Sequence, residues 1–136
     1  MYYIDTSLGN VRAYDYDKAS GDITNERLII EVPDSLGYPD GMTIDAEGKL
    51  WIALWNGHAV SRWDPDTGKL LQTIEVPALN VTSCAFGGPD LATLYITSAR
   101  IGTSPEQLEA YPAAGGVFTV KPGVKGVPSP LFRSGE

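Results

Sequence analysis

The sequence predicts an all-β protein that forms part of a β-propeller, and three observations carry this prediction. A pair of an aromatic residue and isoleucine recurs in three strand-like segments, as Tyr3-Ile4, Trp51-Ile52 and Tyr95-Ile96, at spacings of 48 and 44 residues. Turn residues such as Glu47-Gly48 separate short segments that are rich in Val, Ile, Tyr and Trp. Helical periodicity is absent, apart from a short turn near residues 105–108. Repeats of this length with four short strands each are typical of propeller blades.

The expected strands make an incomplete arc of nearly three four-stranded blades within one domain, residues 1–136. The blades cover approximately 1–33, 34–77 and 78–136, and the first lacks its inner strand, which we expect ahead of Met1. The expected strands are 2–6, 10–16 and 23–32; 40–46, 49–55, 58–63 and 69–77; and 82–87, 93–98, 116–120 and 126–133. Propellers typically have four to eight blades. We therefore expect bare apolar faces at both ends, and either self-association or a missing N-terminal half that completes the ring.

Composition narrows the class of partner. A net charge of −7 argues against nucleic acid and against an anionic membrane. Cys84 is the only cysteine, which excludes an internal disulfide and fits a reducing compartment. The chain has neither an apolar run of membrane-spanning length nor a signal-peptide pattern after Met1. We therefore expect a cytoplasmic protein.

The segment from Tyr38 to Asp45, which contains the triplet Pro39-Asp40-Gly41, is the most informative motif. We expect Asp40 to open the inner strand of the second blade and to point into the mouth of the central channel. A carboxylate in this place suits a hard divalent cation, which prefers oxygen ligands. The alternative is an ordinary turn aspartate, because Asp-Gly after Pro is common turn chemistry.

This segment resembles the gluconolactonase/regucalcin (senescence marker protein) family, and further matches run along the whole chain. They are Tyr2–Asp5, Tyr14–Asp17, Thr82–Gly88 and Gly115–Phe118. The resemblance implies a propeller of the six-bladed type, of which this chain is the C-terminal half. It also implies that Asp40 is a ligand of a divalent metal ion (calcium, zinc, manganese or magnesium). The partner ligands, a Glu and one or two Asn residues, would lie upstream of Met1.

For function, the resemblance implies that the complete protein is a metal-dependent hydrolase of sugar or aldonic-acid lactones, a carboxylic ester hydrolase. Asp40 would be the metal ligand and the catalytic base. We expect the isolated chain to be inactive, because it holds at most one of several ligands. Two other interpretations stay open: a calcium-binding regulator, and a non-enzymatic partial propeller whose bare blade faces bind another chain.

Three residues near Asp40 are candidates for substrate binding. Thr82 takes the place of Asp40 in the next blade, where its hydroxyl would contact substrate, although a β-branched residue that starts a strand explains it as well. Trp55 and Asn56 lie in the loop between the second and third strands of the second blade. They suit stacking on a sugar-like ring and hydrogen bonding to it, and packing at the edge of the core is the alternative for Trp55.

Two further candidates are less specific. Tyr38 precedes the Pro-Asp-Gly triplet, and it would either contact substrate or pack at the edge of the core. Arg100 begins an insertion, residues 100–115, that we expect to form a rim or a lid over the channel. Its guanidinium would contact an anionic substrate, and the alternative is an ordinary surface arginine.

Other kinds of site are disfavoured by the sequence. The segment Asp64–Lys69 lacks the glycine and the bidentate glutamate of a calcium loop, so we expect a hairpin turn there. His58 is the only histidine, and no nucleophile-elbow serine precedes it. Cys84 lies within an apolar strand, where a small packed side chain is expected instead of a reactive thiol.

Overall fold

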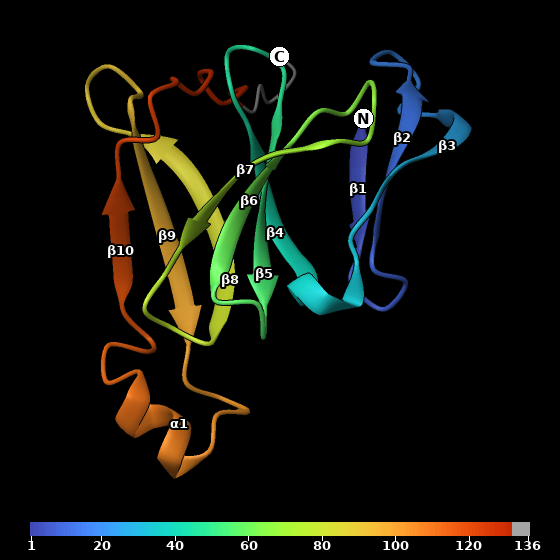
Figure 1. Ribbon diagram of the computed structural model, residues 1–136. Helices are drawn as coiled ribbons and strands as arrows, with labels where there is room; N and C mark the ends of the chain where they lie inside the picture. The colour runs from blue at the N-terminus through green and yellow to red at the C-terminus, as the bar shows by residue number, and fades with distance from the viewer. Residues whose placement is uncertain (132–136) are drawn as a thin grey trace.

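Three antiparallel sheets stand side by side in the computed structural model, which describes residues 1–131 (Figure 1). We call them blade one (β1-β2-β3), blade two (β4-β5-β6-β7) and blade three (β10-β9-β8). The strands are β1 Tyr2–Asp5, β2 Asn10–Tyr16, β3 Ile23–Glu31, β4 Tyr38–Ile44, β5 Leu50–Trp55, β6 Ala59–Trp63, β7 Leu70–Glu75, β8 Asn80–Gly87, β9 Thr93–Ala99 and β10 Val117–Val120. The predicted all-β arc of propeller blades is confirmed. No helix in residues 1–131 is long and apolar enough to cross a membrane.

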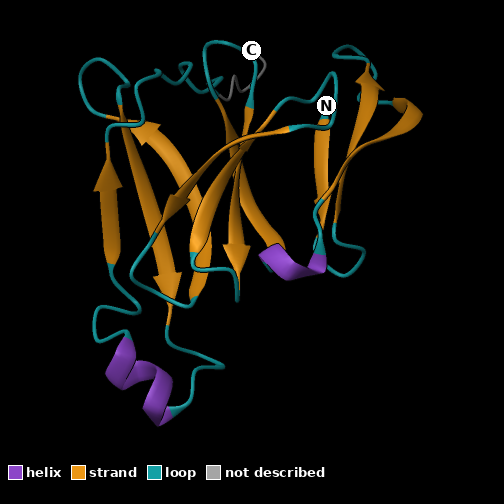
Figure 2. Cartoon of the chain, viewed as in Figure 1, coloured by secondary structure: helices purple, strands orange, loops and turns teal. Residues whose placement is uncertain are grey.

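Two short helices mark one rim of the arc, which we call the helical rim. The 3-10 helix η1 (Asp34–Leu36) leads into β4, and α1 (Pro105–Ala110) lies in the insertion after β9 (Figure 2). Helix α1 starts with a capping box, in which the Ser104 side chain accepts from the Gln107 amide and the Gln107 side chain accepts from the Ser104 amide. The turn predicted near 105–108 is therefore a capped helix of six residues.

The outer strand predicted for blade three at 126–133 is wrong for residues 126–131, which form no strand. Gly126 instead makes an isolated bridge to Asp45, and its amide donates to the Leu91 carbonyl at 2.9 Å. Pro128 and Pro130 have no amide hydrogen, so neither can donate to a ladder beside β10. Residues 132 and 133 lie outside the described residues.

The core consists of two apolar clusters that lie on either side of blade two. Leu50, Ile52 and Leu54 of β5 pack with residues of blade one, including Val11 and Ile30. The intervening residues of β5 point the other way, where Trp51 and Ala53 pack with Val81, Leu94 and Ile96 of blade three. Both faces of β5 are thus apolar and fully covered, as expected for a strand buried on two sides.

The two interfaces between blades differ in polarity. Within the described chain, no hydrogen bond or ion pair joins residues 1–31 to residues 34–131. Blades two and three are also joined by hydrogen bonds, for example from the His58 amide to the Leu79 carbonyl at 3.2 Å. The Ala46 amide likewise donates to the Lys125 carbonyl at 2.8 Å. Apolar packing alone therefore attaches blade one, whereas blades two and three are held by packing and polar contacts.

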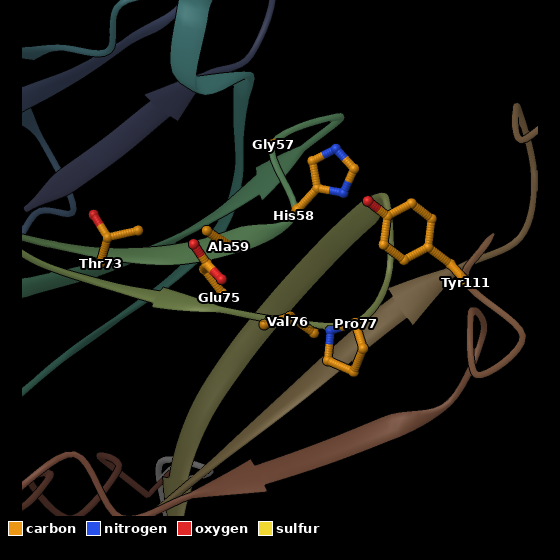
Figure 3. A pocket seen from close by; sticks show the side chains of 8 residues that line it. All are labelled: Gly57, His58, Ala59, Thr73, Glu75, Val76, Pro77 and Tyr111. Carbon is orange, nitrogen blue, oxygen red and sulfur yellow. The ribbon is translucent and has the colours of Figure 1, made fainter. Parts of the chain in front are cut away.

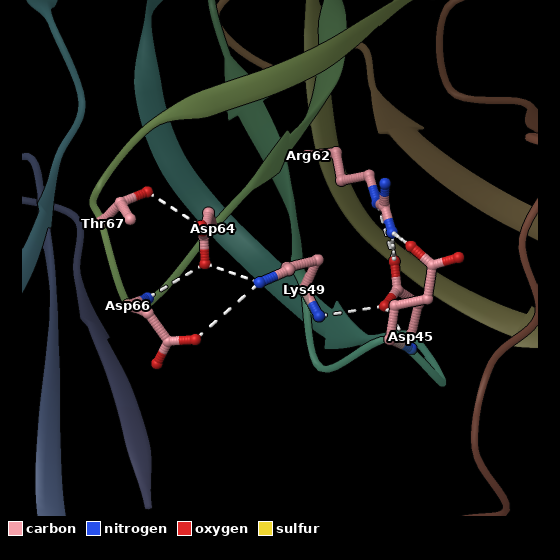
Figure 4. A network of polar contacts seen from close by, with 7 residues as sticks. Asp45, Lys49, Arg62, Asp64, Asp66 and Thr67 are labelled. Atoms are coloured by element: carbon pink, nitrogen blue, oxygen red, sulfur yellow. Dashed lines mark hydrogen bonds and ion pairs between the residues drawn. The ribbon is translucent and has the colours of Figure 1, made fainter.

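A buried carboxylate organises the rim opposite the helices, which we call the ion-pair rim (Figure 4). Asp45 is 1% exposed and accepts from the Trp51 indole at 2.9 Å and from Nε of Arg62 at 2.8 Å. The backbone amides of Glu47 and Lys49 each donate to its other oxygen at 2.9 Å. Burial by itself would raise the pKa of Asp45, but these hydrogen bonds and the Arg62 charge outweigh it and hold that pKa below its ordinary value.

A second carboxylate extends this network to the next turn. Asp64 accepts from Nζ of Lys49 at 2.7 Å and from the Thr67 hydroxyl at 2.9 Å. These hydrogen bonds lower the pKa of Asp64 to about 2. The segment Asp64–Lys69 is therefore a turn at the ion-pair rim, and its first carboxylate is already occupied by protein donors.

We predict that Asp45→Asn lowers the free energy of unfolding by about 3 kcal/mol at pH 7, because it leaves Arg62 without its buried counter-charge. The folded-state pKa of Asp45 lies below its ordinary value of 3.8. Its contribution to stability is thus present above the unfolded pKa and lost as the pH falls through the folded pKa. Urea denaturation at pH 7 and pH 3 should show a smaller loss on acidification for Asp45→Asn than for the wild type.

Asp15→Asn is the matched control, because Asp15 pairs with Arg27 at 2.8 Å with both side chains about half exposed. An exposed ion pair contributes little to stability. Equal destabilisation by the two variants would show that the buried Asp45 network contributes no more to stability than an exposed ion pair.

We also predict that the isolated chain self-associates at tens of micromolar, because the outer faces of blades one and three are bare. Tyr3 and Leu28 lie on one row of the outer face of blade one, on either side of Arg12, and are 52% and 53% exposed. Light scattering should report a mass above that of the monomer, and Leu28→Glu should reduce it. Ile101→Glu, at an apolar residue that is 76% exposed in the insertion, is the control. A compact monomer at this concentration would contradict the prediction.

Candidate functional site

Asp40 lies in a β-bulge near the start of β4. Pro39 pairs with Leu54 and Met42 pairs with Ile52, so Asp40 and Gly41 together face the single residue Ala53. The strand begins at Tyr38, two residues earlier than predicted, so the carboxylate is carried by the third residue of the strand and not by the first. A bulge redirects side chains locally, and here it sets the direction of the Asp40 carboxylate.

The Asp40 carboxylate is half-buried and has no counter-charge among the described residues. Burial raises its pKa, and neither a hydrogen bond nor a positive charge offsets this effect. No group of three or more His, Cys, Asp and Glu side chains in residues 1–131 is arranged so that it could hold a metal ion. A half-buried carboxylate without a donor suits a cation ligand, and the remaining ligands would have to come from outside the described residues.

Thr82 occupies the same kind of position in blade three. The register of β8 shifts between Val81, which pairs with Ser98, and Ser83, which pairs with Thr97. Thr82 is therefore the bulged residue, and its hydroxyl lies 2.8 Å from the Thr97 hydroxyl. The alignment of Thr82 with Asp40 in the sequence thus corresponds to two bulges on the inner strands of adjacent blades.

The two inner strands approach each other at Gly41. A methyl group placed there would lie 2.4 Å from the Ser83 hydroxyl oxygen and 2.7 Å from its Cβ. Only glycine allows this approach without a shift of the neighbouring strand. Ser83 was not singled out by the sequence analysis, and the structure places it directly beside the residue that follows Asp40.

Tyr38, Trp55 and Asn56 lie together at the helical rim. Tyr38 pairs directly with Trp55 across β4 and β5, and its side chain is 47% exposed. Trp55 is half-buried, so the structure combines the two interpretations of this residue: part of the indole packs and part is accessible. Asn56 is exposed and has a positive φ of 58°, a conformation that asparagine adopts more readily than most residues.

Arg100 follows β9 and is exposed at the start of the insertion. Its alkyl chain lies against Gly115, where an added Cβ would be 2.9 Å from Cγ of Arg100. The Ser98 hydroxyl accepts from the Gly115 amide at 3.0 Å and donates to the Gly116 carbonyl at 2.9 Å. The two ends of the insertion are therefore held together.

Asn80 is a residue of this rim that sequence reasoning missed as part of the site. It is 1% exposed, and its carbonyl oxygen accepts from the Asn56 amide at 3.1 Å. Its side-chain nitrogen donates to the Ile101 carbonyl at 2.8 Å and to the Thr103 hydroxyl at 3.3 Å. In the sequence, Asn80-Val81-Thr82 fits a glycosylation acceptor pattern, which gives no indication of these contacts.

His58 lies beside a groove of about 620 Å³ near β6 and β7 (Figure 3). Its ring faces Tyr111 of the insertion, with the ring centroids 4.9 Å apart. Its Nδ1 is buried and has no partner among the described residues. Asp40 does not line this groove, so His58 is not brought to the candidate metal ligand.

Cys84 is buried in β8, and burial raises its thiol pKa to about 12, as expected for a packed thiol.

Comparison with known proteins identifies relatives of the chain. A family model described as the SMP-30/Gluconolactonase/LRE-like region matches residues 1–100. Regucalcin of Danio rerio is 52% identical over 129 residues, which are 94% of this chain and 44% of that protein. Regucalcin of Homo sapiens is 49% identical over 128 residues, which are 93% of this chain and 43% of that protein. The chain thus spans less than half the length of these relatives.

Solved structures show the same fold. The regucalcin of Agrobacterium tumefaciens, described as a calcium-binding protein, matches with a TM-score of 0.89 and 35% identity, covering 98% of this chain and 45% of that one. A luciferin-regenerating enzyme matches with a TM-score of 0.83 and 39% identity. The match covers 93% of this chain and 42% of that enzyme's chain. Both matches extend over all three blades.

The close approach of the inner strands generates a stability prediction. Gly41→Ala should lower the free energy of unfolding by about 1–3 kcal/mol, because the added methyl group overlaps Ser83. Ser83→Gly removes the two nearest atoms, so the double variant should be less destabilised than the sum of the single variants. Urea denaturation of all four proteins measures this coupling, and strictly additive effects would contradict the contact.

Proposed function

Because the chain belongs to the SMP-30/gluconolactonase/LRE-like family, we propose that it is part of a metal-dependent hydrolase of sugar lactones. The observation that carries the proposal is the state of Asp40: a half-buried carboxylate at a bulge, with no hydrogen-bond donor or counter-charge in the described residues. A structural aspartate of this chain looks different, as Asp45 shows with four donors. Asp40 therefore fits a residue that binds a ligand better than a residue that stabilises the fold.

Asp40 would hold a divalent metal ion through its carboxylate, together with ligands from outside the described residues. Calcium, zinc, manganese and magnesium all accept carboxylate oxygen. Such an ion, when bound, supplies electrophilic polarisation of the lactone carbonyl and lowers the pKa of a water molecule. Asp40 would also accept the proton of that water molecule as the catalytic base.

The substrate contacts would come from the helical rim and the neighbouring inner strand. Trp55 and Tyr38 offer exposed aromatic surface for the apolar face of a sugar-like ring, and Asn56 offers its amide for the ring hydroxyls. Thr82 would add a hydroxyl from the equivalent bulge of blade three. Arg100 has no ion pair among the described residues and would contact the carboxylate of the opened product.

A second candidate function is calcium binding without hydrolysis, by a regulator located in the cytoplasm. It is favoured by the description of the Agrobacterium tumefaciens relative as a calcium-binding protein. The same Asp40 would serve both functions. Binding of metal without hydrolysis of any lactone would support the regulator. A chain that binds no metal and hydrolyses no lactone would support an interaction module, which binds another chain through its bare blade faces.

We predict that the isolated chain hydrolyses gluconolactone little or not at all, because one carboxylate cannot hold a cation that takes six or more oxygen ligands. In a full-length protein that contains this sequence, Asp40→Ala should lower kcat/KM by about a hundredfold or more, since the loss of even a residue supporting a ligand costs 10–100-fold. Release of acid from gluconolactone, followed with and without a chelator, measures both.

His58→Ala is the control in the same protein, because His58 lies beside the groove that Asp40 does not line. Its effect should be far smaller than that of Asp40→Ala. Metal-dependent turnover by the isolated 136 residues would refute the argument from ligand number, and an unaffected Asp40→Ala variant would refute the site.

A further inference from the structure

We propose that Asn80 is a positioning residue that locks the two loops of the helical rim together, so that the insertion forms a fixed wall of the site and not a moving lid. The lock itself is a property of this chain. Its meaning for catalysis rests on the proposed function, because Asn56 and Arg100 lie in these loops and Trp55 ends the strand before one of them. Asn80 does not act on the reacting atoms.

The geometry of Asn80 supports this role directly. Its side-chain oxygen accepts from the backbone amide of Asn56 in the β5–β6 loop. Its side-chain nitrogen donates to Ile101 and Thr103 of the insertion, so the two ends of one amide group bind different loops. Because the side chain is 1% exposed, water cannot readily replace these partners. Only a side-chain amide offers an acceptor and two donors from one planar group, and it therefore joins the loops at a fixed separation.

Two further contacts close the same junction. The insertion reaches the indole of Trp55 at Gly102, where an added Cβ would lie 3.6 Å from Cζ2. Farther along the insertion, Tyr111 faces the ring of His58 with the centroids 4.9 Å apart (Figure 3). The insertion is thus linked to the end of β5 and the loop after it through Asn80 and by two direct contacts, Gly102 with Trp55 and Tyr111 with His58. A segment that is held at Ile101–Thr103 and at Tyr111, and whose two ends are joined through Ser98, is poorly suited to open and close.

The arrangement has a consequence for binding. Loops that are already fixed lose little conformational freedom when a ligand arrives, so more of the contact energy appears as affinity. A change at Asn80 should therefore weaken substrate binding without changing the chemistry at Asp40. The buried side chain of Asn80 is also unavailable for glycosylation in the folded chain, although Asn80-Val81-Thr82 fits the acceptor pattern.

Hydrogen exchange of the 136-residue chain tests the lock without any activity. Asn80→Ala should raise the exchange rate of amides at 56 and at 101–103 by tenfold or more. Asn80→Asp keeps the acceptor for Asn56 and loses the donors to Ile101 and Thr103, so it should release the insertion and leave the β5–β6 loop protected. Thr103→Val, which removes one hydroxyl, should affect the insertion alone and to a smaller extent.

Asn10→Asp is the matched control, because Asn10 is a second buried asparagine, 8% exposed in blade one, and its amide bonds only to Leu8. It should leave both loops unchanged. Folded Asn80→Asp and Thr103→Val variants with unchanged exchange in 101–103 would overturn the proposal. So would equal release of both loops by Asn80→Asp, because a merely loosened fold would give that result.

Steady-state kinetics tests the effect of Asn80 on catalysis. In a full-length protein with lactone-hydrolysing activity, Asn80→Asp should raise KM about tenfold and change kcat less than twofold. A fall in kcat at constant KM would overturn the positioning role. Absence of hydrolysis in the unmodified protein would refute the proposed function instead, and the exchange experiment would still decide whether Asn80 locks the loops.

Discussion

The two-sided burial of β5 is the constraint on which the rest of the structure depends. Leu50, Ile52 and Leu54 belong to one core cluster, and Trp51 and Ala53 belong to the other. Each fully buried large apolar side chain contributes about 1.5–3 kcal/mol relative to an exposed one. A polar residue on either face of β5 would therefore separate blade two from one of its neighbours. The positions of Asp40 and Asn80 follow from this packing, because β4 and β8 flank the same core.

Most of the fold was predictable because propeller blades repeat. The recurrence of Tyr3-Ile4, Trp51-Ile52 and Tyr95-Ile96 marks one strand per blade, and the structure places these pairs in β1, β5 and β9. The tail could not be predicted in the same way. Its valines resemble a strand, but two prolines weaken any ladder. The contacts of Lys125 with Ala46, and of Gly126 with Asp45 and Leu91, are tertiary contacts that no local pattern reports.

The residues of the candidate site that lie on the inner strands were predictable, because these strands repeat from blade to blade. Asp40 and Thr82 were aligned by counting residues, and both lie at bulges in the structure. Asn80 was not predictable as a junction, because its partners are 21 to 24 residues away in sequence and lie on other loops. The same reason hid Ser83, whose significance comes from the approach of Gly41 on another blade. Sequence patterns report local chemistry, and these roles arise where two blades meet.

The unequal polarity of the two interfaces has a consequence for temperature. Apolar contacts weaken on cooling because their driving force near room temperature is entropic. No hydrogen bond or ion pair joins blade one to blade two among the described residues, whereas blades two and three share hydrogen bonds at both rims. Cold should therefore loosen blade one while blades two and three remain a single cooperative unit. Within this arc, the seam between blade one and blade two would be the first to open in the cold.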